Sequence, residues 1–502
     1  MPFRAIGALS RRIAASPWAL GSVAALAFLL RYVVQAGLPQ GDGPKWWGYF
    51  DQARYLRSAV ALAHGGLDAA DHWYPLGYAL VAAPFARVMP ADPFLIPDCL
   101  LFGVALVGFA RTMRHLGLGP RASAAIFVAT NLLIWPYAKL WVVPWTTSLS
   151  AALLWWLLAL AGDLLAEGRA PVSHRVRDRL MVAMGALAGA LPLVRPTEAL
   201  TSATVGLVVG WTLYRQRRLT LRAMACAVGT GLALVLPYLA LHGAIYGPRA
   251  SDYAVAAALQ GFNLPDLPWK MAVVLVSARP WFPDGHSLIE GFPAIVPGLA
   301  GLIALTWALP SHARRLLGLI ALIALPYCLL FLAYTDLQPP GIWDHSNAHY
   351  FKWLFPLLVA GCWFLIDGLR DRRRRGPAVA ALAAIGLAMC VRPIPVPVGE
   401  DVPARMLLFR GDTTGFWEKG RPTKAWDAAY FRPARIVDAK GVLENVGRYH
   451  QVPDAQGERA IAVWRLFAAH PRRLDPGEPP ALRGPQAPYA RYGVRVGLAW
   501  PW

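Results

Sequence analysis

The sequence predicts an all-α polytopic membrane protein. Of its 502 residues, 56% are hydrophobic and only 16% are charged, and the mean hydropathy is +0.40. A soluble domain averages about 25% charged residues, so a chain of this composition is expected in a bilayer. The apolar runs are continuous and about 17 to 22 residues long, which is the length of a spanning helix. They do not alternate as barrel strands do.

Basic residues lie in short clusters between the apolar runs, as the positive-inside rule expects of cytoplasmic loops. The net charge is +20. Nucleic acid is not expected as a partner, because no basic domain with interleaved aromatic residues is present. The clusters are Arg4/Arg11/Arg12, Arg111/Arg114/Arg121, Arg175/Arg177/Arg179, Arg215/Arg217/Arg218/Arg222, Arg314/Arg315 and Arg370/Arg372–Arg375.

About eleven transmembrane helices fit between these clusters, with the N-terminus inside and the C-terminus outside. The expected limits are 17–37, 93–111, 122–138, 145–163, 180–195, 197–214, 222–242, 288–309, 315–334, 350–368 and 377–391. The run 73–88 is short and interrupted by Pro75 and Pro84, so it is expected as an interfacial helix. The outer segments are then 38–92, 243–287, 335–349 and the tail from Arg392.

Two domains are expected. Residues 1–391 form the transmembrane domain, with 38–92 as its first outer loop. Residues 392–502 form a C-terminal extracytoplasmic domain or tail, which opens with the proline-rich segment VRPIPVPVGEDVP and continues in short mixed runs. Its length is sufficient for a small periplasmic α+β lobe. Five cysteines lie in or beside apolar runs without a CxxC pair, so buried thiols are expected rather than a zinc site.

The first outer loop places two carboxylates just outside a predicted span. Asp42 lies in a Gly-Asp-Gly turn, and Asp51 heads DQARYLRSAVALAHGG, which is expected to be helical. A simple structural explanation exists for both residues, because glycines favour a turn and a carboxylate at a helix N-terminus is stabilised by the helix dipole. The local sequence leaves that explanation and a chemical role open.

Several motifs, taken in order, resemble the GT-C superfamily of membrane glycosyltransferases, which includes protein O-mannosyltransferases and aminoarabinose transferases. Residues 51–59 match its D-x-x-x-Y-x-x-x-A helix, and HWYPLGYALVAAPF (72–85) is similar to its apolar juxtamembrane segment. RTMRHLGLGPRAS (111–123) follows the next span, LPLVRPTEAL (191–200) contains the outer-end arginine, and HSNAHYFKWLFPLL (345–358) is similar to a late R-Y-F-x-P-x-x-P element. The resemblance covers residues 15 to 390.

Two departures from the family pattern concern the site. Many members have Asp-Glu where this chain has Asp51-Gln52, and many have arginine where this chain has His349. The first departure leaves open whether Asp42 or Asp51 is the catalytic carboxylate.

The resemblance implies an inverting glycosyltransferase, which transfers a hexosyl or pentosyl group from a polyprenyl-phosphate sugar donor to an acceptor hydroxyl. The acceptor is a glycan, a lipid or a protein. The protein would be a multi-pass component of a bacterial inner membrane, in contact with lipid and with its active site facing the periplasm. Such a reaction needs a general base, for which Asp51 and Asp42 are the candidates. Partial desolvation raises the proton affinity of a carboxylate at that place.

The leaving phosphate needs cations. The candidates for binding the substrate are Lys45, Arg54, Tyr55, Tyr74, Arg195, His349 and Lys352. Arg195 and Lys352 are favoured, because an ionisable residue near the end of a span is costly without a task; the alternative for both is snorkelling to the interface. Arg54 and Arg57 can instead pair with carboxylates, and Glu198 can pair with Arg195. The aromatic residues of the loop suit either a sugar or a membrane interface.

No cofactor is implied with certainty, but a divalent metal ion is one candidate. Asp42, Asp344 and His345 could supply its ligands. Two further activities remain as alternatives. One is a transporter or flippase of lipid-linked sugars, which would be favoured if an essential acidic residue lay deep in a span. The other is an O-antigen ligase or polymerase. The sugar, the acceptor and the prenyl chain length are not encoded in any motif of the chain.

Overall fold

A computed structural model describes most of the transmembrane part and short pieces of the tail. The described residues are 16–36, 45–166, 174–254, 257, 262, 264, 267–278, 285–334, 337, 342–343, 346–397, 406–409, 430–431, 436–438, 441–443, 448–453, 459–464 and 492–499. Among the residues singled out from the sequence, Asp42, Asp344 and His345 lie outside these ranges.

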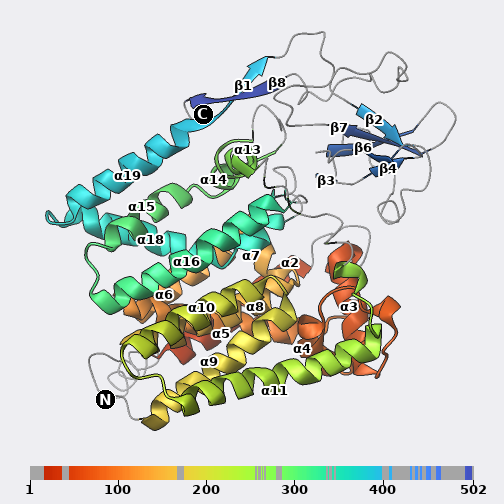
Figure 1. Ribbon diagram of the computed structural model, residues 1–502, viewed down its shortest axis with the longest axis horizontal. Helices are drawn as coiled ribbons and strands as arrows, with labels where there is room; N and C mark the ends of the chain where they lie inside the picture. Colours follow the sequence, from red (N-terminus) through yellow and green to blue (C-terminus); the bar gives the residue numbers. More distant parts are fainter. Residues whose placement is uncertain are drawn as a thin grey trace. The chain divides into compact units, whose positions relative to one another are not determined.

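The described chain is mostly helical, and helices occupy each of the expected spans (Figure 1). The long ones are α2 (Pro17–Ala36), α5 (Leu95–His115), α8 (Thr146–Ala166), α9 (His174–Val194), α10 (Glu198–Arg215), α11 (Leu221–Tyr246), α16 (Ser311–Ala333), α18 (Leu354–Arg370) and α19 (Arg375–Cys390). Within the described ranges, five helices are long and apolar enough to cross a membrane, or six if a bent pair is one span. The count of about eleven therefore stays a prediction.

The expected span 122–138 is not one straight helix. It consists of α6 (Pro120–Val128), the π-helical turn η3 (Ala129–Leu133) and α7 (Trp135–Val142), and the two parts are bent by 94°. Ile134 at the bend is extended. Pro136 lacks an N–H group, so it cannot continue the preceding helix but suits the first turn of a new one. The Trp141 indole donates a 3.0 Å hydrogen bond to the Asn131 side chain across the bend.

The chain divides into two compact units, and each is described by itself. The first comprises Met1–Tyr253, Gly301–Tyr327 and His349–Arg375. In its core α5 packs between α2 and α8, and α9 packs against α11 (Figure 1). The backbones of α2 and α5 approach closely at two glycines. A Cβ atom added at Gly103 would lie only 2.6 Å from the Gly21 carbonyl oxygen. Small residues allow such contacts between helices in lipid.

The second unit comprises Ala254–Ala300, Cys328–Ala348 and Gly376–Trp502. The expected span 288–309 is interrupted, since it consists of α14 (Leu288–Gly291) and α15 (Ile295–Leu305); α13 (Leu267–Met271) and η4 (Ala272–Val276) precede it. The described tail contains β1 (Val391–Pro397), β2 (Met406–Phe409), β3 (Tyr430–Phe431), β4 (Ile436–Asp438), β5 (Gly441–Leu443), β6 (Arg448–Pro453), β7 (Arg459–Trp464) and β8 (Tyr492–Leu498). They pair antiparallel, in the orders β1-β8, β2-β7-β6-β3 and β4-β5.

The first outer loop folds into short elements beside the helical core. These are η1 (Lys45–Gly48), α3 (Phe50–Ala63), η2 (Ala69–Asp71) and α4 (Leu76–Ala86). As expected, α4 is a helix too short to span a bilayer, since 11 residues extend only about 16 Å. Helices α3 and α4 pack against each other, which brings the two ends of the loop together.

Candidate active site

Asp51 lies in the first turn of α3, which begins one residue earlier than the motif suggested. The N-cap residue is Tyr49, and its side chain makes no capping hydrogen bond. The Tyr74 hydroxyl donates a hydrogen bond to Asp51 Oδ1. Burial raises the pKa of Tyr74 well above its usual range, and the neighbouring Asp51 charge raises it further. Tyr74 therefore stays protonated at neutral pH and acts as a donor to the carboxylate.

One face of α3 packs inward around Tyr55. The ring of Tyr55 lies 4.7 Å from that of Tyr74 and meets Tyr78 edge-on at 5.5 Å. Gln52, on the same buried side, donates a 2.9 Å hydrogen bond from its amide to the Pro144 carbonyl oxygen. A glutamate at that position would be an acceptor and could not form this bond when ionised. The glutamine that stands in this chain in place of the family's glutamate therefore makes a hydrogen bond that an ionised glutamate could not make.

The loop segment that contains Tyr74 is held in place by hydrogen bonds of His72 and of a residue at the end of α11. His72 is fully buried. Its Nε2 donates to the Gly66 carbonyl oxygen over 3.0 Å, because that oxygen can only accept, and its Nδ1 accepts the Ser58 hydroxyl at 2.8 Å. The Tyr246 hydroxyl donates to the His72 carbonyl oxygen. These bonds from α3 and α11 position the backbone two residues before Tyr74.

The predicted outer-end arginine is close to the aromatic residues of the loop. Arg195 lies between α9 and α10 and is only 8% exposed. Its guanidinium stacks on the Tyr350 ring at 4.8 Å. Tyr55 is close enough to Asp51, Tyr350 and Arg195 for all three to affect its pKa, which burial chiefly raises and the Arg195 charge opposes. The structure thus brings a carboxylate and a buried guanidinium close to one tyrosine, Tyr55.

Glu198 is the negative charge nearest to that guanidinium in sequence. It is 1% exposed and interacts electrostatically with Arg195. The Thr201 hydroxyl donates a 3.0 Å hydrogen bond to it. A buried guanidinium and a buried carboxylate each reduce the cost of burying the other, so Arg195 does not snorkel to the interface.

His349 is buried among aromatic rings rather than exposed as a cation. It is 4% exposed, and its Nδ1 lies 3.0 Å from the Thr147 hydroxyl. Burial lowers the pKa of His349 well below its usual range, and the charges of Arg195 and Lys352 lower it further. His349 is therefore neutral at pH 7. Where many members of the superfamily have a permanent cation, this chain has an uncharged ring.

Lys352 is fully buried, so it does not snorkel either. Its ammonium donates hydrogen bonds to the Leu140 carbonyl oxygen at 2.9 Å and to the Ser148 hydroxyl at 2.8 Å. It also lies 4.4 Å above the Trp141 ring. One of its donors thus holds the end of α7, and another holds the first turn of α8. A structural role accompanies the phosphate contact predicted for Lys352.

The sequence reading missed Asp98. This residue lies in the first turn of α5 and is 3% exposed, and the Tyr78 hydroxyl donates one bifurcated hydrogen bond to its two carboxylate oxygens, at 2.9 and 2.8 Å. It also attracts the Lys352 ammonium electrostatically. The sequence could have indicated this residue, because it places a carboxylate inside the apolar run FLIPDCLLFG. An ionisable residue in a span is costly to bury and is therefore expected to have an interaction partner.

The remaining predicted cations lie elsewhere. Arg54 stacks on Trp73 at 5.2 Å, and Arg57 forms a 3.4 Å ion pair with Asp71. Lys45 belongs to η1, and its side chain is outside the described part. The alternative of pairing with a carboxylate thus applies to Arg57.

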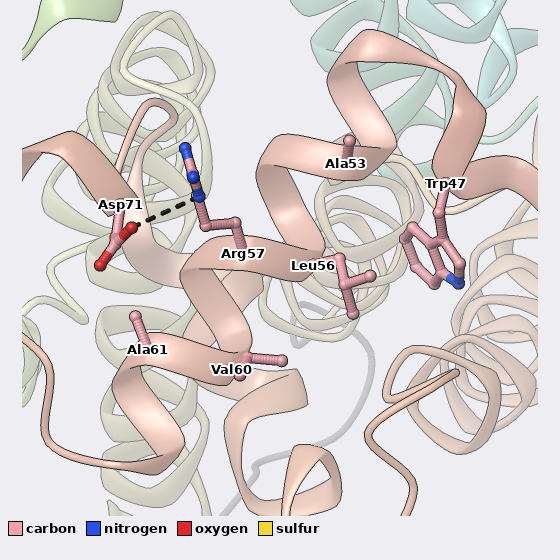
Figure 2. A pocket seen from close by; sticks show the side chains of 7 residues that line it. All are labelled: Trp47, Ala53, Leu56, Arg57, Val60, Ala61 and Asp71. Carbon is pink, nitrogen blue, oxygen red and sulfur yellow. Dashed lines mark ion pairs between the residues drawn. The ribbon is translucent and has the colours of Figure 1, made fainter. Parts of the chain in front are cut away.

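A surface hollow of about 370 Å³ lies against α3, but on the side turned away from Asp51. Figure 2 shows its lining, in which Trp47 faces Leu56 and the Arg57–Asp71 ion pair closes one end. The other lining residues are Ala53, Val60 and Ala61. Residues 53, 57 and 60 share one face of a helix, whereas 51 and 55 share the opposite face. The hollow is therefore separate from the carboxylate.

The described residues contain no group of three or more His, Cys, Asp or Glu side chains that could hold a metal ion. All three candidate ligands, Asp42, Asp344 and His345, lie outside those residues. The metal site remains a prediction.

Searches with protein-family models and among curated proteins found no match to the chain. Two crystal structures of ArnT from Cupriavidus metallidurans are similar to it. The one bound to undecaprenyl phosphate is 18% identical with a TM-score of 0.40, over 73% of this chain and 64% of that one. The apo structure is 19% identical with a TM-score of 0.38, over 72% and 62%. The aligned part thus spans less than two thirds of each ArnT chain. ArnT is an aminoarabinose transferase of the GT-C superfamily.

Proposed function

We propose that the protein is an inverting glycosyltransferase that moves a sugar from a polyprenyl-phosphate donor to an acceptor hydroxyl. The observation that carries the proposal is the Asp51 carboxylate, which Tyr74 holds by a hydrogen bond and which lies close to Tyr55, as the buried Arg195 does. A displacement at an anomeric carbon needs a base for the acceptor and a cation for the leaving group. The membrane setting supports a lipid as the carrier of the leaving group.

In the proposed reaction Asp51 takes the proton of the acceptor hydroxyl as general base. The acceptor oxygen forms a bond to the anomeric carbon, while the bond from that carbon to the phosphate oxygen breaks and its electron pair stays on the phosphate. Attack from the face opposite the leaving group inverts the configuration. Tyr74 holds the carboxylate in place through its hydrogen bond.

The leaving phosphate gains negative charge as the bond breaks, and buried cations stabilise that charge more strongly than exposed ones. Arg195 is a buried cation close to Tyr55, and Lys352 is a second buried cation that, like Arg195, lowers the pKa of His349. We assign them to the leaving group. Asp42 remains the second candidate for the base or for an acceptor contact.

The protein is further proposed to lie in a bacterial inner membrane with this site on the periplasmic face. Among the described helices, the buried carboxylates are Asp98 and Glu198, and both lie in first turns. Carboxylates at helix ends fit a site at the membrane surface better than an ion pathway through the middle of the bilayer.

The direct test is an assay of the purified protein with a panel of polyprenyl-phosphate sugars and hydroxyl acceptors. Release of polyprenyl phosphate that depends on both substrates is expected for at least one donor. Movement of the intact lipid-linked sugar between leaflets of a vesicle, with no polyprenyl phosphate released, would instead identify a flippase.

A further inference from the structure

Four side chains of the first unit form a stacked column beside the proposed site. The column consists of Trp145, His349, Tyr350 and Arg195. Trp145 and His349 are nearly parallel, at 4.0 Å and 13°. His349 and Tyr350 follow at 4.2 Å with their rings tilted by 39°, and the central carbon of the Arg195 guanidinium lies over the Tyr350 ring at 4.8 Å. Residues from three separate parts of the chain thus meet in one row.

The middle of the column is anchored to neighbouring helices. The Tyr327 hydroxyl of α16 donates a 2.9 Å hydrogen bond to the Tyr350 carbonyl oxygen, and the Thr147 hydroxyl of α8 lies 3.0 Å from His349 Nδ1. The Trp145 indole N–H is buried and has no hydrogen-bond partner in the described part of the chain. Stacking on His349 is thus the directional contact that the structure shows for the Trp145 ring.

The column carries one full charge, at one end. His349 is neutral, because burial and the charges of Arg195 and Lys352 lower its pKa. The face of an aromatic ring is electron-rich, so it attracts a cation placed above it. The N–H donors of a guanidinium lie in the plane of the group, and arginine binds phosphate oxygens through this edge.

We propose that Trp145 and Tyr350 are positioning residues, which hold His349 and Arg195 in place so that the guanidinium edge receives the phosphate of the lipid donor. The proposal rests on the proposed function for the identity of that lipid. It adds two residues to the site, neither of which bears a charge. It also explains why an uncharged ring suits position 349: an imidazole can stack between two rings without placing a second cation beside Arg195.

The test compares variants that keep the stacking with variants that remove it. Trp145→Phe and Tyr350→Phe keep a ring, whereas Trp145→Ala and Tyr350→Leu do not. An aromatic contact contributes about 0.5 to 1.5 kcal/mol beyond its buried area, which corresponds to about a 2- to 12-fold change in affinity. We expect the second pair to raise both the KM for the sugar donor and the Kd for polyprenyl phosphate by about that factor. We expect kcat to change less than twofold, and the ring-keeping variants to resemble wild type.

A matched control is Trp211→Ala. Arg215 stacks on Trp211 at 5.0 Å at the far end of α10, and Trp211 is exposed. Its removal is expected to leave KM, Kd and kcat unchanged. Thermal unfolding of each variant, measured in the same detergent, separates a loss of folding from a loss of binding.

Arg195→Lys supplies a second measurement that does not remove a ring. Lysine keeps the charge but has no flat group to stack, so we expect its Kd for polyprenyl phosphate to rise as in Tyr350→Leu. A Kd close to wild type in Arg195→Lys would overturn the proposal, because charge alone would then be sufficient. A loss in Trp145→Phe as large as in Trp145→Ala would also overturn it, because the indole N–H would then contact the ligand directly.

Binding of polyprenyl phosphate is measured without any acceptor, so it reports on the column separately from catalysis. If the wild-type protein binds polyprenyl phosphate but releases none from any sugar donor, the proposed function fails and the column can stand. If it transfers sugar but the ring-removing variants bind polyprenyl phosphate normally, the proposed function stands and the column is wrong. A wild-type protein that does not bind polyprenyl phosphate would refute the column directly.

Discussion

The Tyr74 hydroxyl donates a hydrogen bond to the Asp51 carboxylate, and this bond joins two segments of the first outer loop. Asp51 lies on α3, whereas Tyr74 lies just before α4. The contact answers why a carboxylate stands directly after the first predicted span. It is held by a neighbouring side chain, and the N-cap of α3 is another residue, Tyr49.

Asp51→Asn should separate catalysis from structure. An asparagine side-chain oxygen can still accept the Tyr74 hydrogen bond, but it cannot take a proton from an acceptor. We expect a loss of about 10² to 10⁴ in kcat, the range for a general base, with thermal stability close to wild type. Tyr74→Phe keeps the base and should cost less. The assay is turnover beside thermal unfolding. A stable and fully active Asp51→Asn would refute its role as base, and an inactive Asp42→Asn beside it would move the role to Asp42.

Tyr246→Phe should loosen the segment that carries Tyr74. The variant removes one hydroxyl, which donates to the His72 carbonyl oxygen. A hydrogen bond of this kind contributes about 0.5 to 1.5 kcal/mol. We expect a lower unfolding temperature in a thermal-shift measurement. Tyr214→Phe, which removes an exposed hydroxyl from α10, is the control. Equal stability of the two variants would contradict the assigned contact.

His349 should make stability depend on pH in the acidic range. Its pKa in the folded protein lies below the ordinary value of 6.5, so between the two values the unfolded chain binds more protons. Stability then rises with pH across that window and is lost as the pH falls below about 6.5. We expect a flatter pH profile of the unfolding temperature for His349→Gln than for wild type. His174→Gln, which removes an exposed histidine, serves as the control. A profile for His349→Gln as steep as that of wild type would be the contrary result.

Two glycines on neighbouring helices should respond oppositely to alanine. A Cβ atom added at Gly185 of α9 would clash with the Ala227 backbone of α11, whereas one added at Gly210 of α10 meets nothing within 4 Å. Alanine favours a helix over glycine by about 1 kcal/mol. Gly185→Ala is therefore expected to lower the unfolding temperature and Gly210→Ala to leave it unchanged or raise it. A neutral Gly185→Ala would show that α9 and α11 are not in contact as described.

The arginine clusters predict that the tail lies outside the membrane. A reporter that is active only in the periplasm should therefore be active when it is fused after Trp502. A second reporter fused within the loop after Arg217 should be active only when it folds in the cytoplasm. Activity of the cytoplasmic reporter at Trp502 would contradict the topology and the outer placement of Asp51.

The positions of the helices could be predicted from the sequence, because they depend on local apolar runs. The expected ranges 17–37 and 145–163 correspond to α2 and α8 within a few residues. The bend at Ile134 was not predicted, because the run 122–138 is mostly apolar and the hydrogen bond between Asn131 and Trp141 forms only after folding.

The residue types of the site were also available from the sequence. The motifs in the sequence single out Asp51, Arg195 and His349 as candidates, because the proposed chemistry needs a base and groups that bind phosphate. The side chains that contact these three residues could not be predicted from the sequence. Tyr74, Tyr350 and the other contacts come from segments that are distant along the chain.

The charge state of the site was decided by the tertiary structure alone. The composition shows a histidine and a lysine near the end of a predicted span, and both are ordinary cation candidates. Only packing shows that His349 is neutral between Trp145 and Tyr350, and that Lys352 holds the carbonyl group of Leu140. The physical reason is that burial and neighbouring charges set protonation and hydrogen bonding, and both depend on residues that the linear sequence places far apart.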